Sequence, residues 1–250
     1  MTTVAVLADP PIEGVVCQEL LETTPLDPAD GVALYEAMLS DVCRAVEQSA
    51  GELLLNYRPR DHLDLEVSVS PKTRLETVVS EAVDAPEAVR YEVQVGTSYA
   101  ARVGNTVTHL LEQEDEGSVH VVDPAVPLVT RQAIDSASMK LRRSAVVVSP
   151  ASGGRVGYAG FGRPIGFDGA YDAPAVESLA DSAVEAGLDV DFLPALEPVR
   201  TGADLATVVA EIRARQRAGR NHPTATAEQI DHLGLRVAAD DDGRATVIER

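Results

Sequence analysis

The chain has 250 residues, 45% of them hydrophobic, and its 40 acidic residues against 21 basic ones give a formal charge of −19. This length suffices for one large α/β domain or two small ones, and no apolar run reaches the roughly 20 residues that a membrane span needs. The charge argues against nucleic acid as a partner, because no basic patch is available to meet phosphates. No basic segment precedes Val4, so no secretory signal or membrane partner is expected and the predicted location is cytoplasmic.

The basic residues are unusual in kind, because only Lys72 and Lys140 are lysines and the other 19 are arginines. So large a negative charge repels itself in dilute buffer, whereas molar salt shortens the screening length to about 3 Å. We therefore predict a protein adapted to a salty cytoplasm, as in halophiles; the alternative is an ordinary acidic protein. Cys17 and Cys43 provide neither a disulfide framework nor a metal-ligand cluster.

Apolar periodicity and turn residues divide the chain into alternating strands and helices. Val4–Ala8 is the first predicted strand, and Asp27 with Pro28 opens a helix that Gly51 closes. Further strands are expected at 52–57, 91–95, 118–122, 144–149, 156–161 and 188–193, and further helices at 72–83, 98–113, 130–139, 173–186 and 202–217. This alternation predicts an α/β fold in which a mostly parallel sheet carries helices on both faces.

The end of the chain has a different pattern. Residues 226–233 predict a short helix, and 235–239 with 245–249 predict a hairpin turning at 240–243. We therefore divide the chain into a domain at 1–220 and a small helix-plus-hairpin extension at 221–250.

Three loops follow predicted strands and are candidate ligand loops, because ligands of such sheets collect beyond the carboxyl ends of the strands. They are residues 9–14, 123–127 and 150–154. Asp123 ends a buried strand before a proline-rich loop and is a candidate ligand for a hard cation; the alternative is a turn-forming residue. Gly153 and Gly154 could let backbone N–H groups approach a ligand, or could simply form a turn between strands.

The first loop has the shape of a phosphate loop but not its charge. It carries Asp9, Glu13 and Gly14 and has no lysine or arginine. The five histidines are scattered without metal-ligand spacing, and His120 is expected to point away from the strand face that carries Val119 and Val121.

Taken in order, these segments resemble domain-of-unknown-function family 2064, in the nucleotide-diphospho-sugar transferase (GT-A) superfamily and related to the 2-phospholactate guanylyltransferases. The resemblance covers about residues 3 to 215. It rests on the stretches "GVALYEAMLSDVCRAV", "QVGTSYAARVGNTVTHLLEQ", "VHVVDPAVPLV", "VVVSPASGGRVGYAG" and "LDVDFLPALEPVRTGADLATV". It implies a GT-A-like fold and a nucleotide or nucleotide sugar as partner. It also implies Mg²⁺ or Mn²⁺ on Asp123 as the one cofactor, and nucleotide contacts by Gly14, Gly153, Gly154 and Arg155.

The departures from the family pattern lie at the expected phosphate site. Where the family has Lys-Thr-Arg, this chain has Cys-Gln-Glu at 17–19. Where the family has a lysine before the prolines, this chain has Asp9. Ser152 stands where the family has the aspartate of its Asp-Gly-Gly motif. The Asp-Val-Asp motif near the end of the family's pattern aligns with Pro-Val-Arg at 198–200. Nucleotide phosphates need compensating charge from cationic side chains or a metal, so we predict an eroded site in a non-catalytic binding or regulatory protein.

The alternative function is an active metal-dependent nucleotidyl- or glycosyl-transferase. In that hypothesis Asp123 holds the metal, and Arg155, Arg163 and Arg200 replace the missing cations of the first loop. Arginine side chains that converge on Asp123 would favour this alternative.

Overall fold

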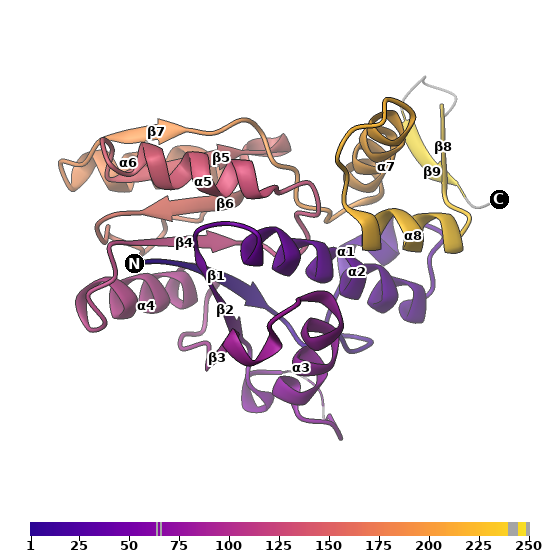
Figure 1. The fold of residues 1–250 in the computed structure, drawn as a ribbon, viewed down its shortest axis with the longest axis horizontal. Coiled ribbons are helices and arrows are strands. Elements are labelled where there is room, and N and C mark those ends of the chain that lie inside the picture. The colour runs from indigo at the N-terminus through magenta and orange to yellow at the C-terminus, as the bar shows by residue number, and fades with distance from the viewer. Residues whose placement is uncertain (64, 66, 240–244, 249–250) are drawn as a thin grey trace.

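The computed structural model describes residues 1–63, 65, 67–239 and 245–248. Seven strands form one sheet in the order β3-β2-β1-β4-β6-β5-β7 (Figure 1). Their bounds are β1 (Thr2–Ala8), β2 (Glu52–Tyr57), β3 (Arg90–Val93), β4 (Ser118–Val122), β5 (Val146–Pro150), β6 (Val156–Phe161) and β7 (Val190–Phe192). All neighbouring pairs are parallel except those of β6, which is antiparallel to both β4 and β5. The predicted α/β class with a mostly parallel sheet is confirmed.

Helices cover both faces of this sheet, as predicted. The helices are α1 (Gln18–Glu22), α2 (Pro28–Glu47), α3 (Pro71–Ala82), α4 (Tyr99–Glu112), α5 (Arg131–Lys140), α6 (Ala175–Glu185), α7 (Gly202–Arg217) and α8 (Thr224–His232). Val4 and Val6 of β1 pack with α2, α3 and α5, whereas Ala5 and Leu7 pack with α4 and α6 on the opposite face. Because both faces are buried, the central strands carry apolar residues toward both faces instead of alternating, with Thr3, His120 and Ser149 as buried polar exceptions.

Local sequence signals set the start of α2 and the junction before β2. The Asp27 carboxylate accepts a hydrogen bond from the Asp30 amide at 2.9 Å, and Pro28 occupies the first turn. The helix ends at Glu47, before the predicted closure at Gly51. Gly51 has another role: a Cβ atom there would lie 2.6 Å from Val4 Cγ2, so only glycine allows β2 to begin so close to β1.

The end of the chain packs on the outer side of α2. Helices α1, α7 and α8 gather there with β8 (Arg236–Ala239) and β9 (Ala245–Ile248), on the right in Figure 1. Leu205, Ile230, Leu235 and Val247 are buried in this cluster. The predicted helix and strand pair are present, while the predicted turn at 240–243 lies outside the described residues. The domain boundary at residue 220 stays a prediction.

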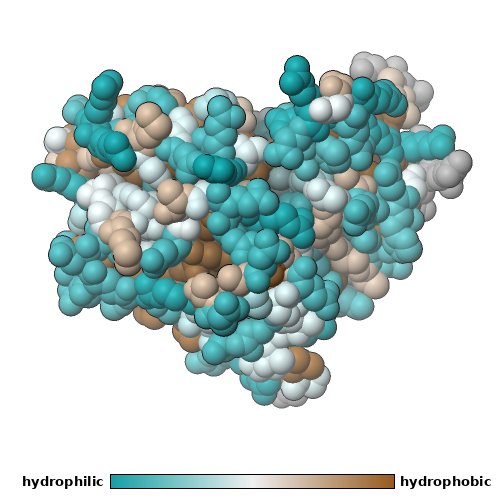
Figure 2. All heavy atoms as spheres, in the orientation of Figure 1, coloured by the Kyte–Doolittle hydropathy of each residue, from teal (hydrophilic) through white to brown (hydrophobic). Residues whose placement is uncertain are grey.

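The surface shown in Figure 2 is predominantly hydrophilic, with small scattered hydrophobic patches. Within the described part of the chain, no helix combines the length and apolar character needed to cross a membrane.

His120 is the buried histidine of the sheet. It lies on β4, fully buried, and its Nδ1 atom shares a hydrogen bond with the hydroxyl of Tyr158 on β6. Val119 and Val121 pack on the other face of the sheet, so the expected direction of His120 is confirmed. Burial lowers the pKa of His120 to about 4.

His120 is expected to make the fold less stable in mild acid. The unfolded chain takes up a proton near pH 6.5 and the folded chain only near pH 4, so stability is complete above pH 6.5 and falls between those values. The loss approaches about 3 kcal/mol, from 1.36 kcal/mol per pKa unit. The measurement is the free energy of unfolding across this range at fixed salt. A His120→Gln variant should show a shallower slope; an unchanged slope would assign the acid sensitivity to other groups.

Candidate functional site

The three predicted ligand loops lie at one edge of the sheet. Residues 9–14 follow β1 and residues 123–127 follow β4, which is parallel to β1. Residues 150–154 begin at the end of β5, which runs in the direction of β4 because β6 is antiparallel to both. Asp123 therefore lies at the carboxyl end of a central strand, as the sequence predicts, on the rim that also carries Gly14 and Gly153, which were expected to face the same cleft.

A cleft of about 610 Å³ opens at this edge. Its walls come from the start of α4, from the end of β4, and from three later segments within 155–156, 168–175 and 198–200. The lining residues with polar side-chain groups are Ser98, Tyr99, Asp123, Arg155, Asp168, Tyr171, Asp172 and Arg200. Of the residues predicted to bind nucleotide, Arg155 lines the cleft, whereas Gly14, Gly153 and Gly154 do not.

The two glycines of the third loop have different surroundings. Both have positive φ, +69° for Gly153 and +71° for Gly154. A Cβ atom on Gly154 would lie 2.7 Å from Cβ of Pro174, while a Cβ on Gly153 would meet nothing within 4 Å. Close packing against Pro174 therefore explains why a glycine is needed at position 154. Of the two glycines, only Gly153 has open space beside it for a ligand.

Asp123 forms the floor of the cleft and already has two partners. Its side chain is only 6% exposed. One carboxylate oxygen accepts a hydrogen bond from the Ala125 amide at 2.8 Å, and the other pairs with the guanidinium of Arg200. The Arg200 side chain is 47% exposed, so a buried carboxylate holds a cation at the cleft surface.

These partners do not fit a resident metal ion. A hard cation needs several oxygen ligands, yet both oxygens of Asp123 are engaged and one is neutralised by Arg200. Within the described part of the chain, no three His, Cys, Asp or Glu residues cluster in a way that could hold a metal. A metal would have to displace Arg200 and find its other ligands elsewhere.

Arg155 is tied to acidic residues within the fold. Its guanidinium contacts both carboxylate oxygens of Asp204, at 2.9 and 2.5 Å, and Glu197 at 2.7 Å. The hydrogen bond to Asp204 raises the pKa of Arg155. Burial alone would raise the pKa of Asp204, but hydrogen bonds from Arg155 and Thr201 hold it below its usual value. Asp204 also completes the capping box of α7 with Thr201, so Arg155 anchors the start of that helix.

Arginines from other elements offset the charge of Asp9 in the first loop. Asp9 pairs with Arg58 at 2.9 Å. Burial raises the pKa of Asp9, and the nearby guanidinium groups of Arg58, Arg102 and Arg200 offset part of this rise. The hydroxyl of Tyr35 donates to the backbone carbonyl of Asp9 at 3.0 Å, which fixes the loop against α2. The loop thus belongs to a cluster that contains three arginines.

Two polar groups near the cleft are buried without a partner. The hydroxyl of Tyr171, which lines the cleft, and Nε of Arg102 have no hydrogen-bond partner among the described residues. The guanidinium of Arg102 lies 5.9 Å from the ring centre of Tyr99, a lining residue. Buried polar groups without partners are costly, and these two could be satisfied by an anionic or polar ligand.

Sequence reasoning identified some of these arginines and missed others. Arg58 and Arg102 were missed, although Arg58 directly follows the strand at 52–57 and Arg102 lies in the first turn of α4. Arg163, a predicted source of positive charge, follows antiparallel β6 and therefore lies at the opposite edge of the sheet. Of the three arginines expected to reach Asp123, Arg200 does so, Arg155 binds other acids, and Arg163 is on the wrong edge.

Comparison with solved structures identifies the fold. A proposed nucleotide-diphospho-sugar transferase from Desulfovibrio desulfuricans G20 superposes with a TM-score of 0.72, at 16% identity over 92% of this chain and 95% of that one. This chain has the nucleotide-diphospho-sugar transferase fold. A cytidylyltransferase from Leptospira borgpetersenii serovar Hardjo-bovis matches this fold more distantly, with a TM-score of 0.50 and 11% identity over 93% of each chain.

No family model and no curated protein matches the sequence. Membership of domain-of-unknown-function family 2064 therefore stays a prediction from the sequence resemblance. In the transferase fold, the cleft around Asp123 lies where ligands of open α/β sheets bind, beyond the carboxyl ends of the strands.

Proposed function

We propose that this chain binds a nucleotide or nucleotide sugar in the cleft around Asp123 and does not transfer nucleotidyl or sugar groups at an ordinary enzymatic rate. It is then a binding or regulatory protein on a transferase fold. The observation that carries the proposal is the pairing of Asp123 with Arg200, because the carboxylate expected to hold a metal holds a cation of the chain itself. Asp123 is a positioning residue in this proposal, and Arg200 is the group that meets phosphate.

Electrostatics support anion binding without a metal. Arg58, Arg102 and Arg200 all lower the pKa of Asp9, while the other acid of the first loop, Glu13, is exposed to solvent. A guanidinium can bind a phosphate through two parallel hydrogen bonds, and the strength of such bonds increases in a cleft that excludes water. Arg200 lines the cleft, while Arg58 and Arg102 act on Asp9 of the first loop, so together they supply the positive charge that this loop lacks.

Catalysis requires more than binding. A transferase of this kind must stabilise charge that builds on the leaving diphosphate, with a metal or several preorganised cations. Losing one such contact typically costs 100- to 1000-fold in rate. Here the metal ligands do not fit and Arg155 is committed to Asp204 and Glu197, so we expect little turnover.

The test measures binding and turnover on the same preparation. Nucleoside triphosphates and nucleotide sugars are titrated by calorimetry in KCl, once with EDTA and once with Mn²⁺. We expect the affinity to be similar in both and to fall at least about tenfold in Arg200→Ala, from the loss of a charge-assisted hydrogen bond. Arg163→Ala is the matched control, since Arg163 is exposed at the opposite edge of the sheet, and it should bind like the unmodified protein.

The competing function is the active metal-dependent transferase, and one observation favours it: an arginine does converge on Asp123. Metal-dependent turnover near 1 s⁻¹, roughly the low end of typical enzymes, that is lost in Asp123→Ala would establish it and overturn the non-catalytic proposal. Binding that requires Mn²⁺ and does not depend on Arg200 would also contradict the proposed role of Arg200.

A further inference from the structure

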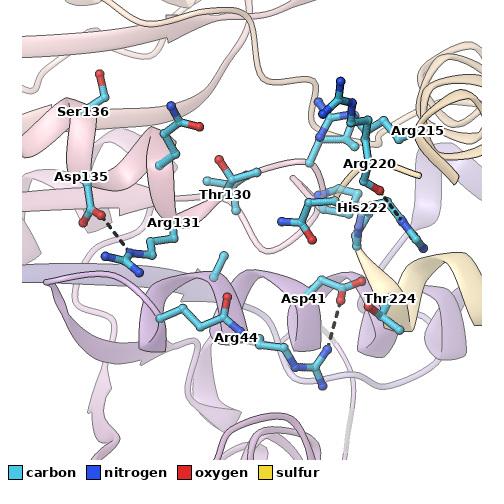
Figure 3. A pocket seen from close by; sticks show the side chains of 18 of the residues that line it. Asp41, Arg44, Thr130, Arg131, Asp135, Ser136, Arg215, Arg220, His222 and Thr224 are labelled. Carbon is cyan, nitrogen blue, oxygen red and sulfur yellow. Dashed lines mark hydrogen bonds and ion pairs between the residues drawn. The ribbon is translucent and has the colours of Figure 1, made fainter. Parts of the chain in front are cut away.

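A second and larger pocket, of about 1080 Å³, lies outside the cleft. It is bounded by the second half of α2, the start of α5, and the turn from α7 into α8, as Figure 3 shows. Its lining includes four of the 19 arginines, Arg44, Arg131, Arg215 and Arg220, and two carboxylates, Asp41 and Asp135. In a chain with a charge of −19, this gathering of cations around one pocket is not explained by the fold.

The arginines enter the pocket from three different elements. Arg44 comes from α2, Arg131 from the first turn of α5, and Arg215 from the last turn of α7 (Figure 3). Gly219, with φ +62°, turns the chain after α7 so that the Arg220 amide donates to the Arg215 carbonyl at 2.8 Å. This turn returns a second arginine to the pocket rim.

Two of these four cations, Arg131 and Arg220, are available to a ligand, whereas Arg215 pairs with Glu211 at 2.5 Å. Arg44 pairs with Asp41 at 3.3 Å, Arg131 with Asp135 at 3.2 Å, and both guanidinium groups reach solvent. The Arg131–Asp135 pair is a surface pair that contributes about 0–1 kcal/mol, so an incoming anion can replace it. The carboxylate of Asp41, by contrast, is buried, and only the guanidinium of Arg44 reaches the pocket surface. Arg220 makes no ion pair with any residue that the structure describes, and it is exposed.

The helix at the pocket wall adds to the positive field. Thr130 caps α5, whose first turn contains Arg131 and Gln132 and no acidic residue. The N-terminal end of a helix carries the positive end of its dipole, and here it lies beside Arg131 instead of the acid that commonly occupies a first turn. The wall therefore offers both a side-chain cation and backbone donors to the same ligand.

We infer that this pocket is a second binding site, for a phosphorylated small molecule that carries at least two negative charges. Arginines on opposite walls suit a ligand with anionic groups at separate positions, because guanidinium groups bind phosphate oxygens in pairs. The volume lies slightly above the usual range for small-molecule pockets, about 300–1,000 Å³. The inference does not rest on the proposed function of the cleft, whose lining residues are all different.

The loop after Asp123 joins the two sites. Asp123 lines the cleft, while Pro127, Leu128 and Val129 of the same loop line the second pocket. The whole segment 123–129 is buried, and the Val199 amide, next to Arg200, donates to Ala125 at 2.8 Å. A ligand in the second pocket would thus contact a buried segment that begins at the floor of the cleft.

The test uses pyrophosphate as the probe, titrated by calorimetry at the lowest KCl concentration that keeps the chain folded. The starting protein is Arg200→Ala, which removes the main anion contact of the cleft. We expect it to bind one pyrophosphate, and a further Arg131→Ala plus Arg220→Ala replacement to weaken this binding at least tenfold. Arg143→Ala is the matched control, since Arg143 is exposed after α5 and does not line the pocket.

Each outcome decides the inference. Malonate, a dianion without phosphate, should bind more weakly than pyrophosphate, and affinity should fall as KCl rises. Circular dichroism and the unfolding midpoint confirm that the variants fold, as expected for two exposed arginines. Absence of binding in Arg200→Ala, or equal binding after the Arg131 and Arg220 replacements, would overturn the second site whether or not the cleft binds nucleotide.

Discussion

Replacing Asp41 with alanine should destabilise the fold by on the order of 3–5 kcal/mol, from unpartnered buried donors worth about 1–3 kcal/mol each. Asp41 lies on α2, but its carboxylate serves the start of α8. It accepts hydrogen bonds from the Ala225 amide at 3.1 Å, and from the amide and the hydroxyl of Thr226, both at 2.7 Å. Without the carboxylate these donors lose their acceptor, and Thr226 is fully buried.

The chain provides graded controls for this prediction. Asp41→Asn keeps one acceptor oxygen and should lose about half of the effect, from the same cost per donor. Asp27→Ala removes the N-cap of α2, whose carboxylate accepts one exposed hydrogen bond from the Asp30 amide, and should cost only about 1 kcal/mol. Unfolding in urea at fixed salt gives the three values. Equal effects for Asp41→Ala and Asp27→Ala would mean that α8 does not depend on Asp41.

The Asp41 contact also shows where sequence reasoning stops. The sequence indicated that Asp41 belongs to the α2 pattern, and periodicity located α8 to within two residues at each end. Nothing in either segment indicates that one would cap the other, because the two are 184 residues apart along the chain. Caps within one segment, such as Asp27 on α2, follow from local sequence; caps between distant segments require the folded arrangement.

The same distinction holds for the candidate site. Asp123 could be placed correctly because the direction of parallel strands brings their carboxyl ends to one edge. Its partner Arg200 was one of three candidate arginines, but which of the three would reach Asp123 could not be predicted, since the contact joins positions 77 residues apart. Arg163 was assigned to the wrong edge because the direction of a single strand, β6, is opposite to that of its neighbours. Short strands between glycines carry no sequence signal for direction.

The second large effect is expected from salt: the unfolding midpoint should rise continuously from low to molar KCl. Forty acidic residues face 21 basic ones, and most of the surface in Figure 2 is hydrophilic. At 0.1 M salt the screening length is about 10 Å, so neighbouring surface acids repel one another; at 1 M it is about 3 Å and the repulsion is largely screened. The measurement is thermal unfolding at a series of KCl concentrations at neutral pH.

Helix α6 offers a site at which this repulsion can be tested locally. Glu177, Asp181 and Glu185 are exposed at intervals of four residues along one side of α6, whose last turn contains no basic residue. Like charges at this spacing destabilise a helix, and opposite charges stabilise it by about 0.2–0.5 kcal/mol per pair. Asp181→Lys converts two repulsive pairs into two attractive ones. It should therefore raise the midpoint at low salt and have little effect in molar KCl.

Comparing the salt dependence of the unmodified chain with that of Asp181→Lys separates charge screening from other effects of salt. If repulsion among surface acids causes the dependence, Asp181→Lys must flatten it, because the variant carries two fewer units of negative charge where the local repulsion is strong. KCl also strengthens apolar burial in any protein when it is excluded from the surface, and that contribution would raise both midpoints in parallel. A midpoint that stays flat or falls with KCl in the unmodified chain would remove the prediction of salt adaptation.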